Sequence, residues 1–340
     1  MSARSDLDVL VVGGGTFGST LATLLSGQGH RVELWVRRKE QVKEINEKHT
    51  NSRYLGEFKL HENLRATTDL AASVPKTPVV LVVVPSKFFR GVAREIGDSL
   101  EGDQILVHAT KGIEIDTFKR MSDILREETC AKKIGVVSGP NLAREIIAGQ
   151  PAGALVASRY DEVADSIQAL FEGSWMRMYA GRDVIGTEIG GSFKNIIALA
   201  AGVADGMGLG DNTKALLITR GLSEMARFGV AEGADVFTFG GLAGIGDLMA
   251  TCASPLSRNH QVGERLAKGE KLKKIIESMT QVAEGVTTTK AVFKQVQHLG
   301  LDLPIVRAVY GLLYKDWPGK KALENLMAIP VGRELAALRF

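Results

Sequence analysis

The chain has 340 residues, more than one hydrophobic core usually supports, and 45% of them are apolar, so its composition predicts two folded domains. Charged residues make up 24% of the chain, are mixed in sign and leave a formal net charge of only +3. Such a chain has no field strong enough to require a nucleic acid as partner. Its longest aliphatic run, Val79 to Val84, is far below the roughly 20 residues that a membrane-spanning helix needs.

Two features of the sequence indicate a reducing, cytoplasmic environment. The first apolar run, Leu10 to Val12, is too short for the apolar region of a secretory signal. The cysteines, Cys130 and Cys252, lie far apart and belong to no CxxC or Cys/His pattern, which argues against a disulfide framework and against a zinc site. We therefore expect a cytoplasmic protein that needs no metal, with both cysteines as small core residues.

The first half of the chain alternates short aliphatic runs with polar, helix-forming stretches. This alternation is typical of a parallel sheet covered by helices on both faces. The predicted strands are Leu7–Val12, Arg31–Val36, Val79–Val84, Gln104–Ala109, Ile134–Val137 and Gly153–Ala157. With helices between most of them, they predict a Rossmann-like, doubly wound α/β domain.

After Asp183 the pattern changes to long segments rich in Ala, Leu and Gly that lack β-branched alternation. Ile196 to Val203 and Lys214 to Phe228 are examples, and both are expected to be packed helices. The sequence thus predicts a dinucleotide-binding domain over residues 1–185 and an all-helical substrate-binding and catalytic domain over residues 186–340.

A glycine-rich loop follows the first predicted strand. The residues Gly13 to Gly18 form a GxGxxG motif, and the helical run Ser19 to Gly27 comes directly after it. The first glycine permits a tight turn, the second lets the backbone approach a pyrophosphate, and the third allows close packing of helix and strand. Strand, loop, helix and second strand fall within about 30 residues, so the motif predicts a bound dinucleotide rather than a simple turn.

The end of the second predicted strand bears on the choice of cofactor. An NAD-selective site normally places Asp or Glu there, whereas this chain has Arg37 and Arg38. Two guanidinium groups can pair with a 2′-phosphate, so we predict a preference for NADP(H), with NAD(H) as the alternative cofactor. An exposed basic strand end without a ligand is the other interpretation.

Lys194 stands inside a largely apolar, helix-forming stretch, residues 186–198. Burial lowers the pKa of a lysine by disfavouring its charged form, which suits proton exchange near neutral pH. Alternatively, the side chain extends to solvent from the helix surface. Composition does not decide between the two interpretations.

A second glycine-rich segment, residues 240–246, has four glycines in seven residues, too many for an ordinary helix at about 1 kcal/mol each. It leads to Asp247, which could orient or pair with a lysine. Ser257, Arg258 and Asn259 follow, and together they offer the donors that a phosphate requires. The alternative for these three residues is a helix cap or a surface turn.

Taken together, these segments resemble the bacterial NAD(P)-dependent glycerol-3-phosphate dehydrogenases over nearly the full length. The motifs that carry the resemblance are Gly13 to Gly18, Val84-Pro85-Ser86, Ala109 to Glu114, Ser138 to Glu145, Glu188 to Asn195 and Leu242 to Asn259. The resemblance implies a Rossmann-like N-terminal domain, a helical C-terminal domain and a homodimer. It also implies the reversible reduction of dihydroxyacetone phosphate to sn-glycerol 3-phosphate, which supplies glycerophospholipid synthesis.

By the same resemblance, hydride comes from the nicotinamide and Lys194 gives a proton to the substrate carbonyl. Lys111 is the second lysine at the substrate, and Asp247 is the carboxylate linked to the catalytic lysine. The implied substrate-binding residues are Lys111, Gly139, Asn141, Lys194, Asp247, Ser257, Arg258 and Asn259. The implied cofactor-binding residues, with those from the loop and strand end, are Gly13, Gly15, Thr16, Phe17, Gly18, Arg37, Arg38, Lys111, Ala143, Arg258, Val282 and Glu284. Asn141 stands where Ser or Thr is common in relatives, which puts its side-chain contact in doubt.

Two other functions are compatible with this pattern. A hydroxyacid or ketopantoate-type reductase also joins a Rossmann domain to a helical one and uses a lysine, but it selects a carboxylate instead of a phosphate. A non-catalytic NADPH sensor would need the fold but not Lys111, Lys194 and Asp247 together.

Overall fold

The computed structural model describes residues 7–255, 257–279 and 282–327, and these form two compact units. The sheet unit holds the described residues up to 110 together with 121–184. The helical unit holds residues 111–120 together with the described residues from 185 onward. The segment 111–120, which the sequence analysis placed in the first domain, therefore groups with the helices although its neighbours in the chain belong to the sheet unit.

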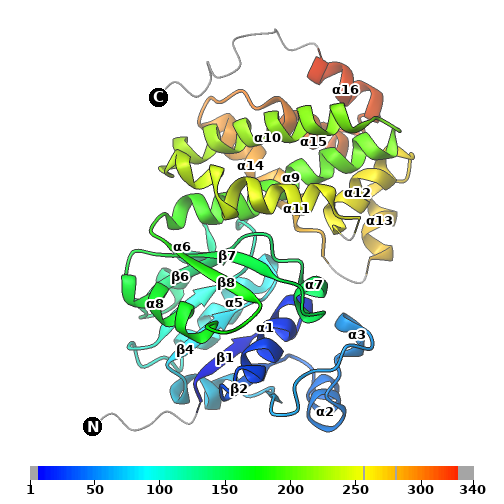
Figure 1. The fold of residues 1–340 in the computed structure, drawn as a ribbon. Coiled ribbons are helices and arrows are strands. Elements are labelled where there is room, and N and C mark those ends of the chain that lie inside the picture. Colours follow the sequence, from blue (N-terminus) through cyan, green and yellow to red (C-terminus); the bar gives the residue numbers. More distant parts are fainter. Residues whose placement is uncertain (1–6, 256, 280–281, 328–340) are drawn as a thin grey trace. The chain divides into compact units, whose positions relative to one another are not determined.

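In its described residues, the sheet unit contains one eight-stranded sheet in the order β3-β2-β1-β4-β5-β6-β7-β8. Figure 1 draws this unit in blue to green. The strands are β1 (Val9–Val12), β2 (Val32–Trp35), β3 (Arg65–Thr67), β4 (Val79–Val82), β5 (Ile105–His108), β6 (Ile134–Ser138), β7 (Ala152–Ser158) and β8 (Met176–Gly181). All pairs from β3 to β6 are parallel. β7 is antiparallel to β6 and parallel to β8.

All six predicted strands are present, and the doubly wound domain is confirmed. β3 and β8 were not predicted, because β3 has only three residues and β8 alternates with exposed positions instead of forming an aliphatic run. The expectation of a parallel sheet is wrong at β7. An aliphatic run indicates that a strand is buried but not in which direction it runs.

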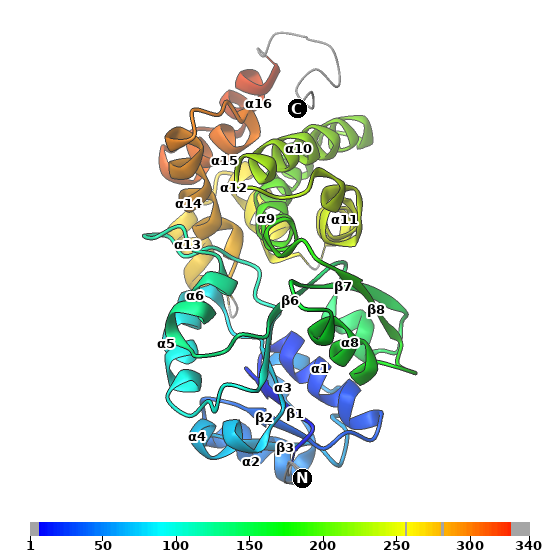
Figure 2. The same cartoon turned by 90° about the vertical axis from the view of Figure 1, so that its left-hand side faces the viewer.

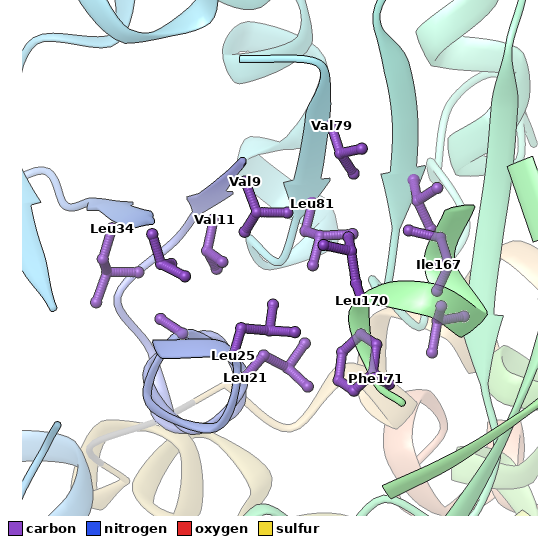
Figure 3. Close-up of a cluster of buried hydrophobic side chains, with 14 of the residues drawn as sticks. Val9, Val11, Leu21, Leu25, Leu34, Val79, Leu81, Ile167, Leu170 and Phe171 are labelled. Carbon is purple, nitrogen blue, oxygen red and sulfur yellow. The ribbon is translucent and has the colours of Figure 1, made fainter. Parts of the chain in front are cut away.

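Helices cover both faces of the sheet. They are α1 (Thr16–Gly27), α2 (Lys39–Lys48), α3 (Ser52–Leu55), α4 (Leu70–Ser73), the short 3₁₀ helix η1 (Val74–Lys76), α5 (Ser86–Gly97), α6 (Met121–Glu128), α7 (Ala143–Ile147) and α8 (Asp161–Leu170). On one face, Val9 and Val11 pack with Leu25 of α1 and Leu170 of α8 (Figure 3). On the other face, Leu10 joins a cluster with α5 and α6 (Figure 2). Strand residues alternate between two buried faces, which explains why these strands are continuous aliphatic runs.

The helical unit is organised around α9 (Val184–Gly206), which lies between α11 and α14 (Figure 2). All α9 residues from 186 to 204 are buried. The other elements are α10 (Asp211–Ala231), the 3₁₀ helix η2 (Val236–Gly240), the π-helical turn η3 (Leu242–Gly246), α11 (Asp247–Ala253), α12 (Arg258–Ala267), α13 (Leu272–Ser278), α14 (Glu284–His298), α15 (Pro304–Tyr314) and α16 (Gly319–Met327). The predicted helices at 196–203 and 214–228 are confirmed within α9 and α10.

The two cysteines differ in exposure. Cys252 is buried as expected, but Cys130 is exposed, because it follows the end of α6 in a surface connection. Across the described residues, no helix is long and apolar enough to cross a membrane. Nor do three or more His, Cys, Asp or Glu side chains in that part of the chain come together as a metal site.

The loop between β1 and α1 is so compact that two of its positions require glycine. Gly13 has a φ of +124°, and a Cβ there would lie 2.5 Å from the carbonyl oxygen of Val83. Gly18 lies in the first turn of α1, where a Cβ would be 1.9 Å from the carbonyl oxygen of Gly13. Neither clash can be relieved by a side-chain rotation, since both involve backbone atoms. The glycines thus let α1 begin directly against the end of β1.

Gly18→Ala should destabilise the sheet unit by about 1–3 kcal/mol, as forced overpacking does. Gly91→Ala is the matched control, because Gly91 is also helical, in α5, and an added Cβ would meet no atom within 4 Å. This control should be neutral or stabilising by up to about 1 kcal/mol, the difference in helix propensity. Urea unfolding followed by circular dichroism compares them, and equal stability of both variants and the wild type would contradict the packing argument.

Candidate functional site

In the sheet unit, the predicted cofactor residues and the predicted substrate residue Gly139 lie at the ends of parallel strands. Because β1 to β6 are parallel, their carboxyl ends share one edge of the sheet, where open α/β sheets bind ligands. The residues at this edge are Gly13, Gly15, Thr16, Phe17 and Gly18 after β1, Arg37 and Arg38 after β2, Gly139 after β6, and Ala143 at the start of α7. Thr20 Oγ1 donates to the carbonyl of Ala143 at 3.4 Å, so α7 lies against α1.

The glycine loop has the form that a pyrophosphate requires. Gly15 is the N-cap of α1, and an added Cβ there would meet nothing within 4 Å. The first turn of α1 therefore has an open approach beside Gly15, where backbone N–H groups and the positive end of the helix dipole favour an anion. The residues present fit a dinucleotide.

The two arginines after β2 differ in exposure. Arg37 is exposed, and its guanidinium lies 5.4 Å from the ring centroid of Phe88. Arg38 is half-buried and is the N-cap of α2. Phe88 itself is 43% exposed near the start of α5, and the sequence analysis did not single it out. The sequence signal for Phe88 was an aromatic residue three positions after Pro85, since guanidinium groups stack on aromatic rings.

Asn141, after β6 at this edge, has a side chain whose hydrogen-bonding groups are not paired within the described residues. Its amide nitrogen and oxygen are both buried, and neither has a hydrogen-bond partner among the described residues. Leaving buried polar atoms unpaired costs about 1–3 kcal/mol each, so such a group marks a place where a ligand can supply the missing bonds.

In the helical unit, three charged side chains meet. Lys194 of α9 donates to one oxygen of Asp247 and, at 2.7 Å, to Thr251 Oγ1. Lys111 donates to the other oxygen of Asp247 at 2.7 Å. The Lys194 and Asp247 side chains are 8% and 2% exposed. One buried carboxylate therefore holds two ammonium groups, and the interpretation in which Lys194 extends to solvent is wrong.

The glycines of the second glycine-rich segment explain how Asp247 reaches Lys194. A Cβ on Gly190 of α9 would lie 2.3 Å from the carbonyl oxygen of Ala243, and one on Gly244 would lie 2.1 Å from that of Phe239. The turn η3 can therefore pack directly on the backbone of α9. Asp247 follows it as the first residue of α11, at the depth of the buried lysine.

Burial sets the protonation of Lys194. Loss of hydration is the largest effect, and it lowers the pKa of the ammonium; the Asp247 carboxylate opposes this, and the Lys111 charge adds to it. The pKa of Lys194 is lowered to about 7. The amine can therefore give or take a proton near neutral pH.

The predicted phosphate residues have structural contacts as well. Ser257 caps α12 by accepting a hydrogen bond from the His260 N–H at 3.3 Å, as the helix-cap alternative proposed. Arg258 is exposed and donates to the carbonyl of Val282 at 2.9 Å. This bond holds the segment just before α14, whose first residue is Glu284.

Asn259 connects three helices. Its oxygen accepts from the Gly285 N–H of α14 at 2.9 Å, and its nitrogen donates to the side-chain oxygen of Asn195 at 2.8 Å. Asn195 follows Lys194 on α9. Neither Asn195 nor Thr251 was predicted as a site residue. Each had a signal in the sequence: Asn195 is adjacent to Lys194, and Thr251 lies one helical turn after Asp247.

Comparison with known proteins agrees with this geometry. Residues 8–164 match the family model for the NAD-dependent glycerol-3-phosphate dehydrogenase N-terminus, and residues 183–324 match the model for its C-terminus. The chain belongs to the NAD-dependent glycerol-3-phosphate dehydrogenase family. The resemblance seen in the sequence motifs is thereby confirmed.

Curated relatives named glycerol-3-phosphate dehydrogenase (NAD(P)+) align with this chain over most of its length. The one from Corynebacterium glutamicum strain R is 46% identical over 91% of this chain and 94% of its own length. The one from Lysinibacillus sphaericus is 42% identical over 97% and 99%. The crystal structure of glycerol-3-phosphate dehydrogenase from Coxiella burnetii has a TM-score of 0.91 at 32% identity, covering 95% of this chain and 99% of that one.

The chain is also similar to a ketopantoate reductase from Ralstonia eutropha, with a TM-score of 0.58 and 16% identity over 93% of this chain and 100% of that one. At this identity the likeness shows the fold alone, so it gives no support to the ketopantoate alternative.

Asp247→Asn should lower the pKa of Lys194 below its present value of about 7, because the carboxylate is the group that raises it. The measurement is the pH dependence of Lys194 acetylation by a trace amine-reactive reagent, read by mass spectrometry. Asp205→Asn is the control, since Asp205 pairs with Lys214 and His260 at the other end of α9. An unchanged or raised Lys194 pKa in Asp247→Asn would rule out Asp247 as its charge partner.

Proposed function

We propose that this chain reduces dihydroxyacetone phosphate to sn-glycerol 3-phosphate, reversibly, with a nicotinamide dinucleotide as hydride carrier. The observation that carries the proposal is the buried cluster of Lys111, Lys194 and Asp247 in a member of this family. The product would supply glycerophospholipid synthesis. We further propose that the protein works in the cytoplasm as a homodimer.

The dinucleotide is assigned to residues 1–185 and the chemistry to residues 186–340, with the segment 111–120 contributing Lys111. When bound, the cofactor supplies a hydride to the carbonyl carbon of the substrate. The residues proposed to hold it are Gly13, Gly15, Thr16, Phe17, Gly18, Arg37, Arg38, Lys111, Ala143, Arg258, Val282 and Glu284. Arg37 and Arg38 support a preference for NADP(H), because guanidinium groups pair well with a phosphate.

Lys194 is the proposed proton donor. As the carbonyl carbon is reduced, its oxygen gains negative charge, and the Lys194 ammonium transfers a proton to it, leaving a neutral amine. In the reverse direction the neutral amine takes the proton of the hydroxyl group. Asp247 orients the amine, and Lys111 is the second cation at the developing oxyanion. With a pKa of about 7, both forms of Lys194 are populated near neutral pH.

The substrate phosphate is assigned to Ser257, Arg258 and Asn259, with Gly139 and Asn141 near the rest of the substrate. Their structural contacts leave donors for a ligand. Ser257 accepts a bond as a cap but keeps its hydroxyl proton, the Asn259 amide has a second N–H, and a guanidinium has five N–H groups. A phosphate has three terminal oxygens to accept from these donors, whereas a carboxylate has two, so the set favours a phosphorylated ketone.

The test is an assay of NADPH absorbance with three ketones. Dihydroxyacetone phosphate should be reduced, whereas pyruvate and ketopantoate should not, because neither carries a phosphate. Lys194→Ala should lose roughly 10²- to 10⁴-fold in kcat, the usual contribution of one acid–base group, while still binding NADPH. Reduction of ketopantoate instead of the phosphorylated ketone would refute the proposed substrate. If no ketone is reduced, the result would favour a non-catalytic sensor. Near-normal turnover by Lys194→Ala would remove this lysine from the mechanism.

The double variant Arg37→Ala/Arg38→Ala should raise the KM for NADPH much more than the KM for NADH, because only NADPH carries the 2′-phosphate. Arg126→Ala on α6, where the arginine pairs with Asp123, is the control for loss of a surface positive charge. Steady-state kinetics with each cofactor give the comparison. Equal effects on both cofactors would refute the assignment of these arginines.

A further inference from the structure

Residues 111–120 form a hairpin that carries one lysine of the candidate site. Glu114 N–H donates to the Lys119 carbonyl at 3.0 Å, and Ile113 and Arg120 form an antiparallel bridge. Ile113 is buried in the core of the helical unit. The hairpin is thus a small folded element packed on the helices.

The ring of Phe118, at the tip of the hairpin, meets Phe228 of α10 edge to face, with 5.9 Å between the ring centroids. Phe118 has a φ of +59°, which is costly for a residue with a side chain. The packing of its ring offsets the cost of this strained backbone. This contact holds the turn of the hairpin on α10, seven residues along the chain from Lys111.

The two ends of the hairpin are held by ion pairs. At one end Lys111 reaches Asp247, and at the other the Arg120 guanidinium donates to Glu188 of α9 at 2.9 Å. The Glu188 side chain is 2% exposed and that of Arg120 is 18% exposed. A buried pair of this kind is often no better for stability than a well-packed apolar pair, but separating its partners leaves a buried charge uncompensated, so the pair ties this end of the hairpin to α9.

Glu188 lies six residues before Lys194 on the same helix, which corresponds to about 9 Å along the axis. The anchor point of Arg120 is therefore at a set distance from the buried amine. Asp247, the anchor of Lys111, is bonded to that same amine. Both ends of the hairpin are therefore tied to α9, directly through Glu188 at one end and through Asp247 and Lys194 at the other.

We propose that Arg120 and Glu188 are positioning residues: their ion pair fixes the hairpin on α9 so that the Lys111 ammonium stays on Asp247. This proposal rests on the proposed function of the Lys194 site. Neither residue is a catalytic residue in it, because they act through Lys111.

The proposal has a consequence that a purely structural role would not have. Among the described residues, the ionisable groups with the largest effect on the pKa of Lys194 are Asp247 and Lys111, and the Cys252 thiol interacts with the same pair. Lys111 lowers the pKa of Lys194. If the hairpin is released, Lys111 moves away and Asp247 interacts with Lys194 alone, so the pKa of Lys194 should rise.

The experiment uses the full chain with Glu188→Gln, which keeps the shape but removes the charge, and with Arg120→Lys, which keeps the charge but loses the planar fork. In Glu188→Gln, kcat for dihydroxyacetone phosphate should fall roughly 10- to 100-fold, as misplacement of a reacting group by about 1 Å does. NADPH affinity should be unchanged, and the inflection of the kcat/KM profile should move to higher pH. Arg120→Lys should lie between Glu188→Gln and the wild type in both respects.

Glu270→Gln is the matched control, because it breaks the more exposed Arg265–Glu270 pair of the same unit. It should leave kcat and the inflection unchanged. In a Lys111→Ala background, Glu188→Gln should cause no further loss, because the residue through which it acts is gone.

Two results would overturn the proposal: an unchanged inflection in Glu188→Gln, or a further loss of kcat when Glu188→Gln is added to Lys111→Ala. If Glu188→Gln does not fold, Arg120→Lys decides by the same two measurements. A wild type that fails to reduce dihydroxyacetone phosphate would refute the proposed function instead. In that case the acetylation pKa of Lys194, which needs no turnover, still tests whether Glu188 acts through Lys111.

Discussion

The shared carboxylate of Asp247 is the interaction on which the candidate site depends. It accepts hydrogen bonds from Lys111 and Lys194 at once, and both its oxygens are occupied. Without it, the buried Lys194 would lose its proton, because an unpaired ammonium is too costly in a protein interior and the pKa would fall further. With it, Lys194 keeps a pKa of about 7, low enough to lose a proton and high enough to regain one. The close packing of η3 on α9 through Gly190 follows from the same need, since Asp247 has to reach the depth of the lysine.

The two units offer different means of holding an anion. At the sheet edge, the turn at Gly15 leaves backbone N–H groups at the start of α1 open to a ligand, and Arg37 and Arg38 add charge after β2. In the phosphate site proposed for the helical unit, side chains would hold the anion, among them Arg258 and the Asn259 amide. Several of these groups also hold the fold together: Arg258 fixes the chain at Val282, and Asn259 joins Gly285 to Asn195. In the proposed site, the same side chains would therefore bind the ligand and stabilise the packing of the helices.

The comparisons with known proteins show that a similar fold can belong to proteins with different substrates. A ketopantoate reductase has a similar arrangement of elements at 16% identity, yet its name describes a different substrate. The family match, in contrast, spans both domains of this chain and includes the segments that supply the lysines and Asp247. Function is therefore argued from those residues, as the chemistry of a site requires.

Local sequence patterns were sufficient for most of the strands and for the chemistry of single residues, but not for the short β3 or the half-exposed β8. Aliphatic runs located six strands, and a lysine in an apolar helix was recognised as a candidate site. The GxGxxG motif predicted a helix from Ser19, and α1 begins three residues earlier, at Thr16 inside the motif. These signals are local because they depend on residues that are neighbours in the chain. Only the tertiary structure decided that β7 runs antiparallel to β6, that residues 111–120 join the helices, and that Ser257 caps α12. Lys111 and Asp247 are 136 positions apart, and Lys194 and Asp247 are 53 apart, so no local pattern records their contact. Whether a lysine is buried and paired depends on which distant segments pack around it, and that is a property of the folded chain.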